Sequence, residues 1–162
     1  MKHTIKTITG IAALEGQWLR RRHFDEEVLA HVAERIKQSE SSHTGELVLA
    51  IEATMPSHEK DPHLRALEVY GRLRVWDTPL NSGVLLYLAL DKKAIEIIAD
   101  RGIQVPQAQW QQVCARLEAR LAKADYIEGL LSAVDDIELI LKAHAPQGDT
   151  EADVLPNDPV LL

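Results

Sequence analysis

Residues 76–103, WDTPLNSGVLLYLALDKKAIEIIADRGI, decide the fold because they form two apolar runs joined by a short polar segment. The run 83–90 is rich in Val, Leu and Tyr, which is typical of a strand buried on both faces. Residues 91–93 form a turn, and 94–99 form a second run with three isoleucines. We therefore predict an antiparallel hairpin.

The predicted hairpin gathers polar residues at its open end. In the register that places Gly83 opposite Arg101, Asn81 and Asp100 lie at the same edge of the sheet. A slip of one residue would change the partners but not the end at which they meet. This edge is therefore the first candidate site.

Composition limits the class of protein. The chain has 162 residues, enough for one domain with a real core, and its net charge of -7 argues against nucleic acid as a partner. A single cysteine excludes an internal disulfide and suits a reducing compartment. The longest apolar run, 84–90, is far shorter than the ~20 residues of a membrane span. No apolar signal sequence is recognised at residues 1–10, so we expect no transmembrane segment and a cytoplasmic location.

Helical and strand patterns flank the hairpin. We predict a helix over 25–42 capped by Asp25, a strand over 46–53, and a helix from Asp61-Pro62 to about Trp76. The third of these is expected to bury Leu64, Leu67 and Leu73, with Trp76 as its last core residue. The alternative is that Trp76 is a partly exposed anchor.

Two more helices follow the hairpin. The first is predicted to begin at Pro106, and the second after Asp125, which with Glu128 resembles a capping box. Three parts result: an N-terminal extension over 1–24, a domain over 25–145 and a proline-rich acidic tail over 146–162.

The order of elements predicts the fold class. A helix connects the first strand to the second, which implies a parallel, right-handed crossover, and the hairpin adds an antiparallel strand. We predict an α/β fold, a three-layer α/β/α sandwich with a small mixed sheet. The parallel first strand places Glu46 at the same end as Asn81, Asp100 and Arg101.

Three separated motifs resemble the TPM-domain family, in particular its small soluble bacterial members. Asn81-Ser82-Gly83 match an Asn-x-Gly before the second strand, and Gly102 matches the second glycine of a Gly-x-Gly whose first position is Asp100 here. Residues 125–129 match a Gly-Asp-Tyr-x-x-Gly turn, except that Ala124 replaces its first glycine. The resemblance covers about 25–145.

The resemblance implies an α/β/α sandwich and a range of activities. The family is often labelled phosphatase, some members bind divalent cations, and others resemble accessory factors for membrane complexes. Many carry a signal peptide and a membrane anchor, neither of which is recognised in this sequence, so roles tied to an envelope are not expected to carry over.

The sheet edge offers oxygen ligands of the type that Ca²⁺ or Mg²⁺ prefers. We assign Glu46 and Asp100 as metal ligands, and Asn81 and Arg101 as ligand-binding residues. The alternative is structural, with Asn81 in an Asx-turn and Asp100 capping the strand or pairing with Arg101.

Other reactive residues have plainer interpretations. His58 and His63 lie in a polar segment without a zinc-binding pattern, and Cys114 lies along an apolar helix face as a core thiol. The basic run 20–23 is a solvated surface or a contact for an acidic partner. We therefore expect a binding or accessory module that contacts an unidentified protein partner. The alternative is a weak metal-dependent phosphatase in which Arg101 binds a phosphoryl oxygen.

Overall fold

The computed structural model describes residues 11–149 and 154–162. In this part of the chain, four strands form one sheet in the order β3-β2-β1-β4. Their bounds are Glu46–Glu52 for β1, Gly83–Ala89 for β2, Ala94–Ala99 for β3 and Val160–Leu161 for β4. β1 is parallel to β2, and β2 is antiparallel to β3, which confirms the predicted crossover and hairpin.

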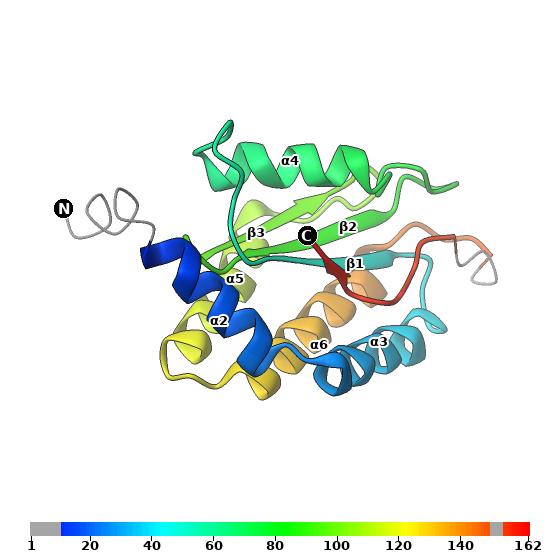
Figure 1. Cartoon of the computed structure of the whole chain (residues 1–162). Coiled ribbons are helices and arrows are strands. Elements are labelled where there is room, and N and C mark those ends of the chain that lie inside the picture. Colours follow the sequence, from blue (N-terminus) through cyan, green and yellow to red (C-terminus); the bar gives the residue numbers. More distant parts are fainter. Residues whose placement is uncertain (1–10, 150–153) are drawn as a thin grey trace.

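Helices cover both faces of the sheet, so the α/β/α sandwich is confirmed. They are α2 (Ile11–His23), α3 (Glu26–Glu40), α4 (Pro62–Arg72), α5 (Gln107–Ala122) and α6 (Tyr126–His144). Figure 1 shows α4 alone above the sheet, while α3, α5 and α6 lie below it. One face is therefore covered by a single helix.

Alternation along the strands divides the core into two clusters. Leu47, Leu49 and Ile51 of β1 join the cluster that includes α3, α5 and α6. Val48 and Ala50 join the cluster beneath α4. Every residue of β1 and β2 is buried, as expected for strands with helices on both sides.

The predicted hairpin register is wrong by one residue. Ala89 pairs with Ala94, and the turn takes in Leu90, whose carbonyl accepts a bond from the backbone nitrogen of Lys93. Lys93 itself has a positive φ of 52°. Gly83 consequently lies opposite Asp100, whose backbone nitrogen donates to the Gly83 carbonyl over 2.9 Å.

The predicted buried face of α4 is wrong for Leu64 and Leu67, although Leu73 is half-buried against the cluster beneath α4. Its buried residues are Arg65, Ala66 and Val69, whereas Leu64 and Leu67 are exposed. The helix ends at Arg72, before Trp76, and Trp76 is exposed as well. The sequence pattern missed this because an arginine occupies the inner face.

The two flanking segments pack on the domain. In α2, a Cβ added to Gly16 would stand 1.9 Å from the Ala53 carbonyl oxygen, so this helix contacts the end of β1 backbone to backbone. In the tail, Leu155 joins the core cluster on the α4 side of the sheet, and the Leu162 backbone nitrogen donates to the Ile51 carbonyl. β4 is therefore an edge strand that the sequence did not predict.

Two smaller expectations have different outcomes. Asp25 caps α3 as predicted, accepting a hydrogen bond from the Val28 backbone nitrogen over 3.0 Å. Asp125 makes no side-chain cap at α6, and its carboxylate lies instead 3.4 Å from the Arg120 guanidinium.

No helix in residues 11–149 and 154–162 has the length and apolar character needed to cross a membrane.

Candidate functional site

Close backbone packing builds the sheet end that carries Asn81. A Cβ on Gly83 would stand 2.0 Å from the Val75 carbonyl oxygen, and one on Gly102 would stand 2.4 Å from the Asn81 carbonyl oxygen. The Gly102 nitrogen donates to that Asn81 carbonyl over 2.8 Å. Asn81 itself has a φ of 52°, a conformation that asparagine tolerates. The glycines of both motifs are thus required by the backbone geometry.

Asp100 and Arg101 meet Asn81 at this end, as predicted. Asp100 Oδ1 accepts a hydrogen bond from the Arg101 backbone nitrogen over 2.7 Å, and Arg101 Nη2 lies 3.4 Å from Asn81 Oδ1. Asp100 Oδ2 is enclosed by the surrounding protein. Burial, followed by the charge and hydrogen bond of Asp100, raises the pKa of Tyr70, which places this phenol beside the carboxylate.

Glu46 lies at the same sheet end but apart from Asp100. It neighbours Gly83 on β2, and Asp100 lies across the other edge of that strand, so two strand spacings, about 10 Å, separate the two backbones. The Val75 carbonyl fills the space over Gly83 between them. The buried Glu46 carboxylate instead accepts bonds from the backbone nitrogens of Val154 and Leu155, the latter over 2.6 Å.

The structure places the two predicted metal ligands, Glu46 and Asp100, on either side of Gly83, and the cation site stays a prediction. No three His, Cys, Asp or Glu side chains gather as a metal site anywhere in 11–149 and 154–162. The Arg101 guanidinium meets the Asn81 amide, whereas the Asp100 carboxylate is bound by the Arg101 backbone nitrogen. A divalent cation at Asp100 would need backbone carbonyls and water for most of its ligands.

A buried polar network that the sequence did not predict lies at the opposite end of β1. Arg65 of α4 donates from Nε and Nη2 to the two carboxylate oxygens of Glu52, over 3.0 and 2.8 Å. Their side chains are only 5% and 6% exposed. The Tyr87 hydroxyl of β2 donates to the same carboxylate. This fork-to-fork contact fixes α4 against the sheet.

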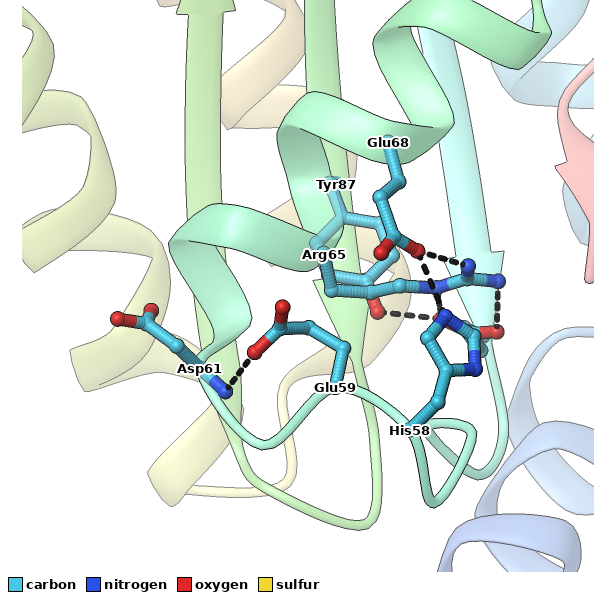
Figure 2. A network of polar contacts seen from close by, with 7 residues as sticks. His58, Glu59, Asp61, Arg65, Glu68 and Tyr87 are labelled. Carbon is cyan, nitrogen blue, oxygen red and sulfur yellow. Dashed lines mark hydrogen bonds and ion pairs between the residues drawn. The ribbon is translucent and has the colours of Figure 1, made fainter.

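The network continues to the surface through Glu68 (Figure 2). Arg65 Nη1 donates to Glu68 Oε2 over 2.8 Å, and His58 Nε2 lies 3.0 Å from the same oxygen. The hydrogen bond from Arg65 lowers the pKa of Glu68, and hydrogen bonding to Glu52 raises that of Arg65. Burial raises the pKa of Tyr87, so it stays a protonated donor. Glu52, Arg65 and Tyr87 already bind one another, which favours a structural role.

A second buried pair joins the loop after α3 to α6. His43 Nε2 contacts Glu138 Oε2, and His43 Nδ1 accepts a bond from the Gly45 nitrogen over 3.1 Å. The Nδ1 contact places the ring proton on Nε2, which donates to the carboxylate. Burial raises the pKa of Glu138, and the bond from His43 opposes that rise.

The remaining reactive side chains have structural surroundings. Burial raises the pKa of the Cys114 thiol to about 11, so it is not a thiolate at neutral pH. His63 lies 3.1 Å from Glu96, just as His58 pairs with Glu68. These contacts agree with the interpretation of Cys114 as a core thiol and of both histidines as ordinary polar residues.

The sheet order, the helical layers and the glycine-built end together define a class, the small α/β/α sandwich with a mixed sheet. The TPM domain family model matches residues 22–139, and the chain belongs to that family. No curated protein matches its sequence.

Two solved structures share the fold. The BA42 protein of the psychrophilic bacterium Bizionia argentinensis is 24% identical, with a TM-score of 0.75 over 85% of this chain and 94% of that one. The N-terminal domain of a P. gingivalis protein is 21% identical, with a TM-score of 0.55 over 72% of this chain and 76% of that one. At these identities the comparison supports the fold alone.

Proposed function

We propose that this TPM domain is a noncatalytic binding module that acts through protein contacts. One observation carries the proposal: the single helix over one sheet face turns leucines outward. Leu64 is 48% exposed, Leu67 is 43% exposed, and Trp76 after the helix is 48% exposed. We call these three residues, with Gly71 on the same outer side of α4, the α4 surface.

The composition of the α4 surface suits binding to a protein. Large apolar and aromatic side chains supply most of the energy at protein interfaces, with arginine as a frequent companion. The Arg74 guanidinium lies 5.6 Å from the centre of the Trp76 ring, so a cation and an aromatic ring are presented together.

The α4 surface is also held firmly in place. Arg65, on the opposite side of α4, is bound to Glu52 of β1 in a buried bidentate contact. A partner therefore meets a preformed helix, and little conformational entropy is lost on binding.

We propose binding of a divalent cation, Ca²⁺ or Mg²⁺, as a second function after protein contacts. The enclosed Asp100 Oδ2 favours a site beside Asn81, although Arg101 already binds Asp100 Oδ1 through its backbone nitrogen and Asn81 Oδ1 through its guanidinium. A cation bound only by the folded state would raise the melting temperature, an effect that Asp100→Ala should abolish. An unchanged melting temperature in millimolar Ca²⁺ and Mg²⁺ would remove the cation from the proposal.

The rival activity is phosphatase, the word in the label of the matched family. Metal-dependent phosphoryl transfer needs clustered carboxylates and cations around the transferred group. Glu46 is instead occupied by the tail, away from Asp100. We expect negligible hydrolysis of phosphomonoesters with either metal. Substantial turnover that Asp100→Asn abolishes would replace the binding proposal with an enzyme.

The binding proposal is tested by placing a photo-crosslinking amino acid at position 67 in the intact chain. The matched control is position 139 on α6, where Leu139 is 67% exposed. We expect defined protein adducts from position 67 and none of the same mass from position 139. The absence of adducts at position 67 would contradict the proposal.

A further inference from the structure

Gly71 is the least expected residue of the α4 surface. It lies in the last turn of α4, one residue before its end, and a Cβ added there would meet nothing within 4 Å. The end of the helix does not require it either, because the residue with positive φ that terminates α4 is Arg74. Arg74 donates to the Gly71 carbonyl, and Val75 donates to the Tyr70 carbonyl, which completes the helix end.

An absent side chain on an exposed helix suits close approach by another chain. Leu64, Leu67 and Gly71 are spaced at i, i+3 and i+7, so they form one seam along the outer side of α4. Leu64 and Leu67 project at one end of this seam, and the missing side chain of Gly71 leaves a gap at the other. The leucines can therefore act as a knob and the gap as a hole.

The charged residues beside this seam are complementary to a reversed copy of themselves. Asp61 caps the start of α4, and the exposed Arg72 lies in its last turn on the same flank. Glu68, between them, is already bound by Arg65 and His58 of its own chain. Two antiparallel α4 helices would therefore bring each Arg72 beside Asp61 of the other copy.

We propose that the partner of the α4 surface is a second copy of this chain, packed with its α4 antiparallel about a two-fold axis near Leu67. In this arrangement Leu64 of each copy packs into the space over Gly71 of the other. Arg72 of each copy faces Asp61 of the other, and the contact is made twice by symmetry. The inference rests on the proposed function, since it names the partner of that same surface.

Sedimentation velocity of the full chain tests this packing from about 1 µM to about 1 mM, a range suited to weak and moderate dimers. The critical variant is Gly71→Gln, which fills the space without altering a contact inside the monomer. Its matched control is Ala119→Gln at an exposed position of α5. A second variant, Arg72→Glu, reverses the charge on the flank and leaves the seam intact. Circular dichroism at the lowest concentration confirms that each variant is folded.

The expected result is a wild-type mass that rises with concentration toward twice that of the chain. Gly71→Gln should weaken association at least tenfold, Arg72→Glu should weaken it less, and Ala119→Gln should leave it unchanged. A wild-type chain that stays monomeric throughout, or a dimer that Gly71→Gln leaves intact, would overturn the inference. The crosslinker at position 67 separates the two proposals: an adduct of twice the chain mass supports both, an adduct of any other mass supports only the binding module, and no adduct contradicts both.

Discussion

Replacing Arg65 with methionine tests how α4 is held on the sheet. Methionine keeps the length and apolar stem of the side chain but removes all three hydrogen bonds to Glu52 and Glu68. The Glu52 carboxylate then remains buried, with the Tyr87 hydroxyl as its remaining donor in the network. Removing one partner of a buried ion pair costs about 3–5 kcal/mol. A single domain has only about 5–15 kcal/mol of stability in total.

The double variant Arg65→Met/Glu52→Met separates two contributions to the loss of stability. One is the unpaired buried charge of Glu52, and the other is the packing lost with the Arg65 side chain. Apolar replacement of both members of a buried ion pair is often close to neutral, so the double variant should be more stable than Arg65→Met alone. The control is Arg35→Met, because Arg35 also contacts both carboxylate oxygens of its partner, Asp135, at 2.9 and 2.8 Å. That pair is 43% and 45% exposed, so its loss should cost less than about 1 kcal/mol.

The assay is urea unfolding followed by far-ultraviolet circular dichroism, with midpoints and slopes compared among the four proteins. Two results would refute the reasoning. One is an Arg65→Met loss no greater than that of Arg35→Met, and the other is a double variant as unstable as the single one. Either result would mean that the buried Glu52 carboxylate costs little stability without its arginine partner, and that packing alone holds α4 on the sheet.

Three further predictions concern stability. Ala124 follows the end of α5 with a φ of 60°, and Ala124→Gly should raise the free energy of unfolding by about 1 kcal/mol in urea; a decrease would contradict this assignment of strain. Deleting 146–162 should cost more than about 2 kcal/mol, because the deletion strips the Glu46 carboxylate of its backbone donors; a smaller loss would show that the tail is dispensable. Burial raises the pKa of Glu138, so its ionised form costs stability at neutral pH and the cost disappears as pH falls through the folded pKa. The stability of Glu138→Gln relative to the wild type should therefore be highest at neutral pH and fall as the pH is lowered toward 4.5, the ordinary pKa of glutamate. A constant difference would contradict the burial argument.

Local patterns predicted most of the secondary structure because each signal lies within one element. The apolar runs of β1 and β2, the Asp25 cap and the Asp61-Pro62 start all appear as expected. The predicted hairpin register was wrong by one residue, because the sequence does not reveal that Lys93 adopts a positive φ and that the turn includes Leu90. The prediction that the polar residues gather at one edge was still right, because both registers place them there.

The candidate site was only partly predictable for a topological reason. Strand order correctly brought Glu46, Asn81 and Asp100 to one end of the sheet. It could not show that Gly83 admits the Val75 carbonyl between the two carboxylates, or that the tail returns to bind Glu46. Both contacts join segments distant in sequence, and no periodicity encodes them.

The exposed α4 surface follows from the buried ion pair on the other side of the same helix. Hydrophobicity alone would rotate α4 to bury Leu64 and Leu67 and to place Arg65 in water. The bidentate contact between Arg65 and Glu52 selects the opposite rotation and keeps both leucines exposed. Natural sequences depart from the local hydrophobic pattern chiefly where function requires it. A partner that covers Leu64 and Leu67 would bury the apolar surface that this rotation leaves exposed. A docking role therefore explains both the buried Arg65 and the exposed leucines of α4.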